Sequence, residues 1–461
     1  MEKIRGCFIL SRDLTYLNNW NSEKKRKPVI LRGARQVGKS TLVRLFAKEQ
    51  GLRLAEINLE RHPLLDQVFA SLNLDTIVPA IEAICKQHFD DKNTLLFLDE
   101  IQATPNALAA LRYFFEDRPN LRVIAAGSLL EFVLSDHKFS MPVGRVAYHW
   151  LRPMSFLEFL LARGEEFLAE KWSRFEVGQN WPESLHLQLW EQYRWYLIIG
   201  GMPEAVAAFV SEGAKEGRIR KIHDNIIASY ADDFAKYARQ SDLMRLQSVY
   251  RQLPKSLGEK VKYSTVLPDE KTMYVKRAID LLSMAGIIHR VVHTNCSGIL
   301  LRANMDDRIY KLYWLDVGLL NRMHGLSWSA VSSQQALISE GLLAEQFVAQ
   351  ELLTSQNTTD PPPLCYWLRE GKRSNAEVDF VVQQDLDIIP IEVKSGSPGT
   401  FKSLAHLVSK IQAKRAVRFS NVLPRMQKMK INVPIGPTME TVEYELVNLP
   451  VYLAGKYVVP Q

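Results

Sequence analysis

The stretch from Gly33 to Thr41, with the sequence GARQVGKST, constrains the fold of this chain more than any other feature. It fits the pattern GxxxxGK[ST]. The apolar run at residues 28–31 predicts a short buried strand before it, and the apolar spacing of residues 42–47 predicts a helix after it. A strand, a glycine-rich loop and a helix in this order point several backbone N–H groups at one spot. This spot lies at the N-terminus of the helix, which is the positive end of its dipole. The sequence therefore predicts a phosphate-binding loop and a chain that binds ATP.

Every residue of this loop is an expected nucleotide contact. Lys39 is expected to reach the β- and γ-phosphates, and the hydroxyl of Ser40 is expected to ligate Mg²⁺. The cofactors implied are therefore ATP and Mg²⁺. The predicted contacts of the loop are Gly33, Ala34, Arg35, Gln36, Val37, Gly38, Lys39, Ser40 and Thr41.

Two carboxylates end an apolar run further along the chain. Residues 94–98 are almost continuously apolar, which predicts a strand buried on both faces, as in a parallel sheet. Asp99 and Glu100 follow at its C-terminal end, where ligands bind in open α/β sheets. Asp99 is expected to hold Mg²⁺, and Glu100 is expected to polarise the attacking water. The alternative, a strand that ends in a solvated acidic turn, is weakened by the phosphate loop that precedes it.

Two further residues are candidates for contacts with the γ-phosphate. A third strand, predicted at residues 121–128, is expected to lie between the other two, so that Ser128 at its end reaches the γ-phosphate or the water. Ser128 is also suited to cap a helix at residues 129–132, and the two roles are compatible. Arg145 is expected either to contact the γ-phosphate, in its own subunit or a neighbour's, or to be a surface arginine in a loop. A contact in a neighbouring subunit would make the chain a homo-oligomer.

The composition is that of a globular protein. The chain of 461 residues is too long for one core, and 47% hydrophobic with 24% charged residues is ordinary usage. No apolar run approaches the roughly 20 residues that span a bilayer, and the N-terminal sequence MEKIR lacks the apolar segment of a signal peptide. The four cysteines show neither metal nor disulfide spacing. We expect a cytoplasmic protein without a membrane partner, whose net charge of +7 permits binding to nucleic acid without requiring it.

The middle of the chain predicts helices and then a winged helix. Residues 153–235 read as helical, with a helix at 185–199 that the sequence GGMP ends. A helical lid beside the ATPase core is the natural assignment. Beyond it, an amphipathic helix at 246–257, a short helical segment at 263–267, a helix at 272–285 and a strand at 287–292 follow the order of a winged helix-turn-helix.

This order places four cations where DNA would lie. Lys271, Lys276 and Arg277 fall on or near the expected recognition helix, and Arg290 falls on the wing. These residues are predicted to contact DNA phosphates and a groove. The alternative is a winged helix used only for packing between domains.

The C-terminal third contains a second candidate active site. Strands are predicted at residues 364–369, 376–382 and 388–394, with a turn at 384–387 between the last two. Asp379, followed by Glu392 and Lys394 on the returning strand, has the layout of the PD-(D/E)xK nuclease core. Two carboxylates on adjacent strands would share a divalent ion, and strand alternation places Lys394 on the same face as Glu392. Glu345, on a helix at 341–353, is available to complete the metal site.

The alternative without a function for these residues is an exposed Glu/Lys pair on a solvated strand face. Asp379, however, lies inside a strongly apolar strand, where an unpaired carboxylate is costly. That position favours a site over surface decoration. The predicted catalytic residues are Glu100 in the ATPase and Glu345, Asp379, Glu392 and Lys394 in the C-terminal third.

The motifs together resemble a known family. The segments LRGARQVGKST, LLFLDEIQ, VIAAGSLLEF, GGMPEAV, KLYWLDVGLL and EVDFVV…IPIEVKSG are similar to bacterial and archaeal AAA-type ATPases that end in a nuclease-like domain of unknown function. The resemblance spans essentially the whole chain. It implies an AAA+ ATPase core with a helical lid, a winged helix, and a C-terminal fold related to restriction endonucleases. The nucleotide residues of the family match at Gly33, Gly38, Lys39, Ser40, Asp99 and Glu100. Its endonuclease-like residues match at Glu345, Asp379, Glu392 and Lys394.

The predicted fold class is therefore α/β, with a P-loop AAA+ core, a helical lid, a winged helix-turn-helix and a restriction-endonuclease-like α/β domain. The predicted domains span residues 1–150, 151–238, 239–330 and 331–461, respectively. The function expected is that of a Mg²⁺-dependent ATPase whose nucleotide state controls a DNA-directed, nuclease-like module. The alternative is a signalling or scaffold ATPase, in which the nuclease-like fold is a binding platform.

Overall fold

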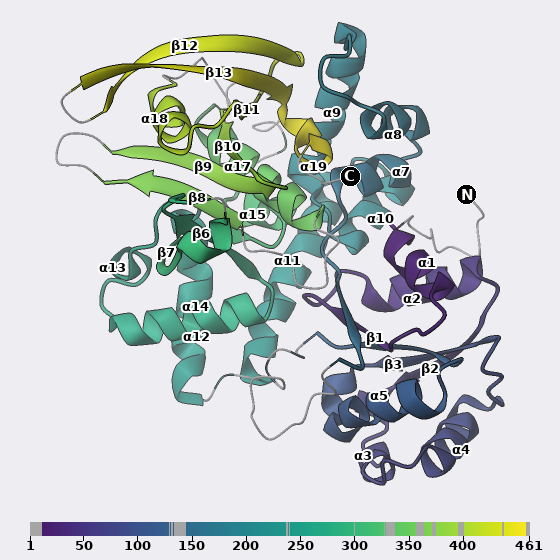
Figure 1. Ribbon diagram of the computed structural model, residues 1–461. Helices are drawn as coiled ribbons and strands as arrows, with labels where there is room; N and C mark the ends of the chain where they lie inside the picture. Colours follow the sequence, from purple (N-terminus) through teal and green to yellow (C-terminus); the bar gives the residue numbers. More distant parts are fainter. Residues whose placement is uncertain are drawn as a thin grey trace. The chain divides into compact units, whose positions relative to one another are not determined.

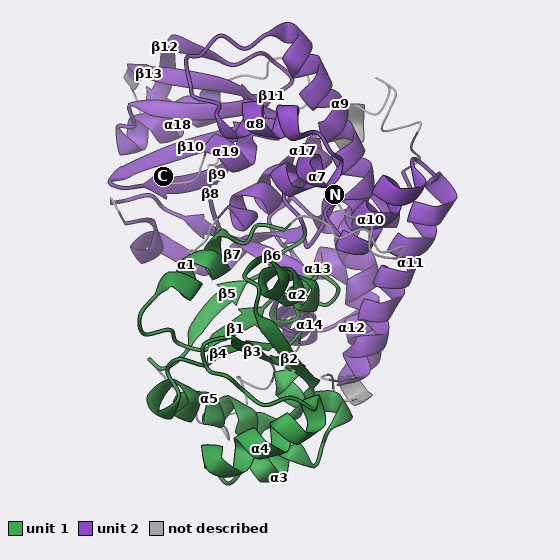
Figure 2. Ribbon diagram, turned by 90° about the vertical axis from the view of Figure 1, so that its right-hand side faces the viewer, with its two compact units in different colours: residues 1–153, 284–287, 357–360 green, residues 154–283, 288–356, 361–461 purple. Residues whose placement is uncertain are grey.

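The computed structural model divides into two compact units (Figure 2). The residues that the structure describes are 12–128, 130, 132, 144–236, 238, 240–298, 300–326, 328, 337–355, 364–370, 375–394, 401–435 and 438–457. Among these, unit 1 comprises the residues up to Pro153 together with Met284–Ile287, and unit 2 comprises the others. No helix among the described residues has the length and apolarity that crossing a membrane requires.

Unit 1 is built on a five-stranded parallel sheet with the strand order β2-β3-β4-β1-β5. Its strands are β1 (Val29–Arg32), β2 (Arg53–Asn58), β3 (Thr94–Asp99), β4 (Arg122–Ala126) and β5 (Ala147–Trp150). The strand before Ser128, β4, lies between the strands of the phosphate loop and of Asp99, as the sequence predicts. Because the strands are parallel, the loops that follow β1, β3 and β4 meet at one edge of the sheet.

Helices cover both faces of this sheet (Figure 1). They are α1 (Thr15–Ser22), α2 (Lys39–Glu49), α3 (Leu65–Phe69), α4 (Leu74–Cys85) and α5 (Pro105–Asp117). Strand alternation divides the apolar side chains between the two faces. Ile30, Leu98 and Ala125 belong to the core cluster that contains the apolar residues of α3, α4 and α5, while α2 buries its own apolar stripe, including Phe46, on the sheet. A mixed α/β architecture with a parallel sheet is thus confirmed for this unit.

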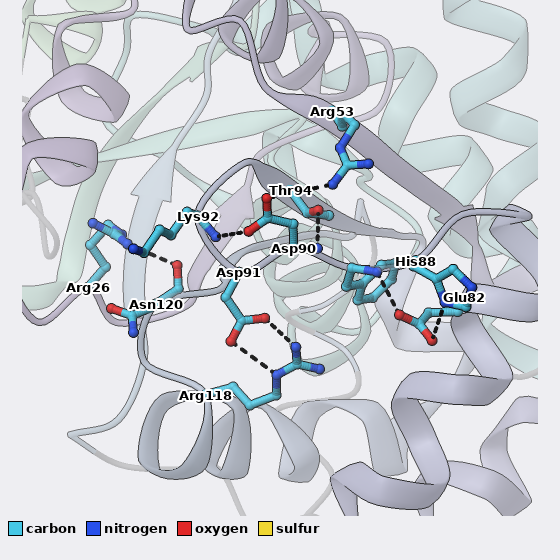
Figure 3. Close-up of polar contacts among 11 residues, drawn as sticks. Arg26, Arg53, Glu82, His88, Asp90, Asp91, Lys92, Thr94, Arg118 and Asn120 are labelled. Carbon is cyan, nitrogen blue, oxygen red and sulfur yellow. Dashed lines mark hydrogen bonds and ion pairs between the residues drawn. The ribbon is translucent and has the colours of Figure 1, made fainter.

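Polar contacts fix the loop that leads into β3 (Figure 3). The backbone N–H of Asp90 donates to Thr94 Oγ1 at 3.0 Å, and the backbone N–H of Lys92 donates to Asp90 Oδ1 at 3.0 Å. Asp91 forms an ion pair with Arg118, which directly follows α5. These contacts lie where β3 begins, at the edge of the sheet opposite to the phosphate loop.

Unit 2 begins with a group of helices. They are α7 (Phe156–Ala162), α8 (Glu166–Ser173), α9 (Glu183–Ile199), α10 (Pro203–Glu212) and α11 (Glu216–Asp233). The predicted break after Ile199 separates α9 from α10. Trp172 Nε1 donates to the carbonyl oxygen of Tyr452 at 2.7 Å, and Trp181 Nε1 donates to the Tyr452 hydroxyl at 3.0 Å. The helices that the sequence assigns to a lid therefore bond to the C-terminal end of the same unit.

The segment with the order of a winged helix follows. Its elements are α12 (Gln240–Gln252), α13 (Tyr263–Val266), α14 (Thr272–Met284), β6 (Ile288–Thr294) and β7 (Met305–Trp314). The helix predicted at residues 246–257 corresponds to α12, which begins and ends earlier in the sequence than predicted. After Gln252 the chain tightens into a 3₁₀ turn, Leu253–Ser256, because Pro254 has no backbone N–H to continue the α-helical ladder.

The remaining elements complete an eight-stranded sheet with the order β12-β13-β11-β10-β9-β8-β6-β7 (Figure 1). They are α15 (Val317–Met323), α17 (Leu337–Thr354), β8 (Leu364–Arg369), β9 (Ala376–Gln384), β10 (Asp387–Val393), α18 (Lys402–Ile411), β11 (Arg415–Ser420), β12 (Arg425–Ile435), β13 (Thr438–Pro450) and α19 (Ala454–Tyr457). Strand β6 pairs in parallel with β8. The hairpin that the sequence assigns to a wing is thus continuous with the strands of the nuclease-like segment.

Candidate functional site

The phosphate loop turns at its two glycines. Gly33 leaves β1 with φ of 133°, and Gly38 caps the N-terminus of α2 with φ of 93°. Side chains rarely adopt either angle. A Cβ added at Gly33 would stand 2.1 Å from the carbonyl oxygen of Leu151, so no larger residue fits there without displacing the backbone. Of the other loop residues, Ala34 and Val37 are buried, Arg35 is half-buried, and Gln36 and Thr41 are exposed.

Lys39 begins α2 and points back into the loop. Its Nζ donates hydrogen bonds to the carbonyl oxygens of Gly33 at 2.9 Å and Ala34 at 2.8 Å. Burial lowers the pKa of Lys39 to about 8, and the charges of Glu100 and Asp99 offset only part of this effect. A buried ammonium held by two neutral carbonyls is poised to exchange them for the anionic oxygens of a phosphate.

Ser40 brings the phosphate loop to the predicted metal carboxylate. Its Oγ donates to Asp99 Oδ2 at 3.0 Å, across the carboxyl ends of β1 and β3. The other oxygen, Asp99 Oδ1, accepts the backbone N–H of Glu100 at 3.1 Å. Burial raises the pKa of Asp99, and the bond from Ser40 opposes this rise. A hydroxyl and a carboxylate are oxygen ligands of the kind that Mg²⁺ takes in nucleotide sites, so the residues present fit this ion.

Glu100 lies next to two side chains that hold its carboxylate. Its backbone takes a left-handed conformation, with φ of 53°. Gln102 Nε2 donates to Glu100 Oε2 at 2.6 Å, and Ser128 Oγ lies 3.5 Å from the same oxygen. The structure therefore brings Ser128, at the end of β4, to the predicted catalytic carboxylate. Gln102 is a residue of this group that no sequence motif predicts, since its only signal is its place two residues after Glu100.

Arg145 lies away from this group. The pairing of β1 with β5 sets Val29 beside Ala147, so Arg145 lies beyond the amino end of β1, whereas the phosphate loop follows its carboxyl end. Its Nε forms an ion pair with Glu116 Oε1 at 2.8 Å. The structure does not bring Arg145 to the phosphate loop of its own chain. A contact in a neighbouring subunit stays a prediction, beside the alternative of a surface arginine.

The predicted DNA contacts lie on or near α14. Lys271, Lys276 and Arg277 are exposed. Arg277 forms an ion pair with Asp242 at 3.3 Å, and Arg290 forms one with Asp280, so two of the four cations already have anionic partners. Of these four cations, Lys271 and Lys276 form no ion pair with a described residue, although Lys271 lies next to Glu270 and acts on its carboxylate.

The C-terminal carboxylates meet where β9 and β10 separate. Strand pairing sets Phe380 beside Ile391, which places Asp379 and Glu392 at neighbouring positions. Asp379 is buried, and its Oδ2 accepts the backbone N–H of Val393 at 2.8 Å. Glu392 Oε1 pairs with Lys394 Nζ at 2.6 Å. Burial first, and then the charge of Asp379, raises the pKa of Glu392 to about 7.

Glu345 reaches the same cluster from α17. Its Oε2 accepts the hydroxyl of Tyr313, on β7, at 3.1 Å. Burial and the charge of Asp379 raise its pKa to about 8. The next residue, Gln346, brackets the backbone of Trp314, accepting its N–H at 2.7 Å and donating to its carbonyl at 2.8 Å. This clamp fixes the helix against β7 and so sets the position of Glu345.

Lys311 is a cation of this cluster that our reading of the sequence missed. It lies on β7, is 1% exposed and forms an ion pair with Glu377. Burial acts to lower the pKa of Lys311, but the charges of Asp379, Glu345 and Glu377 outweigh it, and the pKa is raised. The signal for Lys311 was the one used for Asp379, a charged residue inside an apolar strand.

The cluster offers two carboxylates to a metal ion. Among the described residues, no three histidine, cysteine, aspartate or glutamate side chains gather closely enough to hold one. Glu392 Oε2 is nevertheless buried and has no hydrogen-bond partner within the described part of the chain. An unsatisfied carboxylate oxygen beside Asp379 is a ligand of the kind that a divalent ion takes, and Asp379 and Glu392 are the residues that would hold one.

Comparison with known proteins identifies the domain in which the first of these two sites lies. Residues 25–160 match the AAA domain, residues 190–330 match a domain of unknown function (DUF8612), and residues 340–436 match another (DUF4143). No curated protein matches the chain. The predicted AAA-type ATPase core is thus confirmed, and nuclease-like character in the C-terminal third stays a prediction.

Two solved structures are similar to parts of the chain. The Orc1 protein of Aeropyrum pernix, in a complex with DNA, is 13% identical, with 69% of this chain and 91% of that chain covered and a TM-score of 0.26. The protein VC1899 from Vibrio cholerae is 12% identical, with 86% and 90% covered and a TM-score of 0.16. At these scores neither likeness carries an argument about this chain.

Proposed function

We propose that this chain is a Mg²⁺-dependent ATPase whose nucleotide state controls a DNA-directed C-terminal module. The observation that carries the proposal is the Ser40–Asp99 hydrogen bond of 3.0 Å, next to buried Lys39 and to Glu100. This bond brings together a hydroxyl and a carboxylate, the two groups that would hold the ion. The AAA domain matched at residues 25–160 supports hydrolysis as well as binding.

The residues of this site would have different roles in phosphoryl transfer. Mg²⁺, when bound, would neutralise charge that develops between the β- and γ-phosphates. Ser40 and Asp99 would hold the ion, while Lys39 would leave the carbonyls of the loop and pair with the phosphates. Glu100 would orient the water for attack in line with the leaving oxygen. Gln102 would keep the Glu100 carboxylate aimed, through its bond of 2.6 Å.

The C-terminal module supplies the DNA-directed part of the proposal. The exposed Lys271, directly before α14, and the exposed Lys276, on α14, would contact phosphates. Asp379 and Glu392 would share a divalent ion that activates water at a phosphodiester, and Lys394 would stabilise the charge that develops there. The arrangement on two adjacent antiparallel strands, with an unsatisfied oxygen on Glu392, supports this reading.

A scaffold role is the second candidate, because several charges are already paired. Lys394 is bound to Glu392 at 2.6 Å, and Arg277 and Arg290 pair with aspartates of their own chain. In this case the nucleotide would switch packing within the chain, and the nuclease-like sheet would serve as a binding platform.

The test is ATP turnover by the full chain with and without single- and double-stranded DNA, at a fixed salt concentration. We expect DNA to stimulate turnover, with an affinity that falls steeply as salt rises. Charge reversal at Lys276 and Arg277 should weaken DNA binding, whereas reversal at Lys215 and Arg218, which are also exposed in unit 2, should not. Equal affinity of the two double variants for DNA would indicate that the winged helix serves only in packing between domains.

Metal-dependent nicking separates the two candidates. Wild type is compared with Asp379→Ala and Lys394→Ala, and Lys39→Ala serves as the control for ATP gating. We expect both C-terminal variants to lose cleavage. Activity that survives both would come from another site or a contaminant. Intact DNA binding without any cleavage by wild type would favour the scaffold.

A further inference from the structure

A row of polar side chains crosses the eight-stranded sheet beside Glu392. In the parallel neighbours β10, β11 and β13, Glu392 is paired with Arg418, and Arg418 is paired with Asn448. On the other side of β13, Asn448 is paired with Arg425 of β12. Side chains at paired positions of neighbouring strands point to the same face of a sheet. We call Arg418, Asn448 and Arg425 the arginine–asparagine row.

The donors of this row lack acceptors. Arg418 is 6% exposed, yet within the described residues it makes no hydrogen bond or ion pair, and its Nε is buried without a partner. Asn448 is 1% exposed, and its Nδ2 is likewise unpartnered. Arg425 is exposed and has no ion pair with a described residue. Buried donors are rarely left in this state, so Arg418 and Asn448 call for a ligand, and the exposed Arg425 lies at the position paired with Asn448.

Further donors surround the row. Ser420 lies two residues after Arg418 and thus on the same face of β11, and its Oγ is buried without a partner in the described chain. The guanidinium of Arg418 lies 5.1 Å from the ring of Phe401, the residue that precedes α18. The first backbone N–H groups of that ten-residue helix have no acceptor inside the helix, and its dipole favours negative charge.

The charges of the site call for an anion. Two guanidinium groups flank Asn448. The one carboxylate in line with them, Glu392, acts on Arg418 through its charge without a hydrogen bond, and it already pairs with Lys394. A guanidinium stays protonated in a protein and donates in a planar fork, which matches the oxygens of a phosphate. Amide and hydroxyl donors beside it add neutral hydrogen bonds to the same group.

We propose that the arginine–asparagine row is a phosphate-binding subsite, with Arg418 and Arg425 as charged contacts and Asn448 Nδ2 as a neutral donor. The phosphate is that of a phosphodiester strand that passes the carboxylates Asp379 and Glu392. Assignment of the phosphate to DNA rests on the proposed function, while the existence of the anion subsite does not.

Thermal unfolding with inorganic phosphate tests the subsite alone. The full chain carries Lys39→Ala, so that the phosphate loop does not contribute, and phosphate replaces chloride at constant ionic strength. We expect a saturable rise of the unfolding temperature that Arg418→Gln abolishes. Asn448→Leu should abolish the rise as well, and it provides the test if Arg418→Gln does not fold. The control is Arg415→Gln, an exposed arginine of the same strand that pairs with Glu445 at 3.1 Å, and it should retain the rise.

DNA binding identifies the source of the phosphate. With a double-stranded oligonucleotide, Arg418→Gln should reduce the slope of log affinity against log salt by about one, and Arg415→Gln should leave it unchanged. An unchanged slope together with a lost phosphate effect would overturn the assignment to DNA and leave the site to a smaller phosphate ligand. No phosphate effect with Arg418 intact, or an effect that survives Arg418→Gln and Asn448→Leu, would overturn the subsite. A wild type that does not bind DNA would refute the proposed function, and the phosphate measurement would still decide the subsite.

Discussion

Replacing Lys39 by methionine isolates the cost of keeping a buried cation in the phosphate loop without nucleotide. Burial lowers the pKa of Lys39 from 10.5 to about 8, because Glu100 and Asp99 compensate only partly for lost hydration. One pKa unit corresponds to about 1.4 kcal/mol, so a lowering of this size corresponds to about 3 kcal/mol. The folded-state pKa lies below the unfolded one, and the folded protein therefore binds fewer protons between these values. The free energy of unfolding should rise with pH across the window from about 8 to 10.5.

The measurement is urea unfolding of the nucleotide-free protein at several pH values. We expect the difference in the free energy of unfolding between wild type and Lys39→Met to change by up to about 3 kcal/mol across this window. Absolute stability at neutral pH is a poorer test, since the variant also loses the bonds of Nζ to Gly33 and Ala34. The control is Lys48→Met, an exposed lysine of the same helix, which separates the general effect of removing a lysine from the effect of removing the buried one.

The same variant should lose stabilisation by ATP. At neutral pH, a ligand at a hundredfold excess over its dissociation constant stabilises a protein by about 2.7 kcal/mol. Wild type should show such a rise with Mg²⁺ and ATP, and Lys39→Met should show almost none. If wild type and Lys39→Met show the same pH dependence of the free energy of unfolding, folding does not lower the pKa of Lys39, and the loop does not bury this side chain as described.

Three further predictions concern residues at which the structure imposes a definite constraint. Gly33→Ala should destabilise unit 1 by about 2 kcal/mol or more in urea unfolding, because its Cβ would meet the Leu151 carbonyl; Gly51→Ala, also at positive φ but with open space around it, should cost less. Glu100→Gln should bind ATP as wild type does while phosphate release falls by about 10²-fold or more, and turnover at the wild-type rate would refute its role as the base. Burial raises the pKa of Glu351 to about 8, so its contribution to stability is lost as pH rises from 4.5 through 8. Glu351→Gln should therefore become more stable relative to wild type by up to about 5 kcal/mol across that window, and a constant difference would contradict this.

Much of the secondary structure could be predicted, because its signals are local. The strand expected at residues 364–369 is β8, and the turn expected at 384–387 joins β9 to β10. Both follow from strand alternation and polar turn residues. The partner of β6 could not be predicted in this way. Its apolar residues require a neighbouring strand, but nothing within residues 288–294 specifies β8, which lies far along the chain. Pairing of this kind is decided by the packing of the whole unit.

The motif residues of the candidate sites could be predicted from the sequence. The residues that form hydrogen bonds or ion pairs near them could not. Ser40 and Asp99 were placed by spacing and chemistry, and the structure sets them 3.0 Å apart. Gln102 and Lys311 support neighbouring carboxylates, but their residue types are common and their spacing fits no motif. For Arg145 the sequence left three roles open. The register of β5 on β1 sets it at the edge of the sheet opposite to the phosphate loop of its own chain, so a contact in a neighbouring subunit and a surface role stay as predictions.

Control of the C-terminal module by nucleotide requires that a displacement near the phosphate loop reaches Glu345. Within unit 2, the buried polar residues of α17 provide contacts through which such a displacement would act. Glu351 accepts the backbone N–H of Phe156, the first residue of α7, at 2.9 Å. Only residues 151–155 separate α7 from β5, the strand paired with the one that leads into the phosphate loop. Glu345 and Glu351 share one rigid helix. Under the proposed function, a shift of α7 that keeps its bond to Glu351 would pass along α17 to Glu345, and the spacing of Glu345 and Asp379 would be the quantity to compare between nucleotide states.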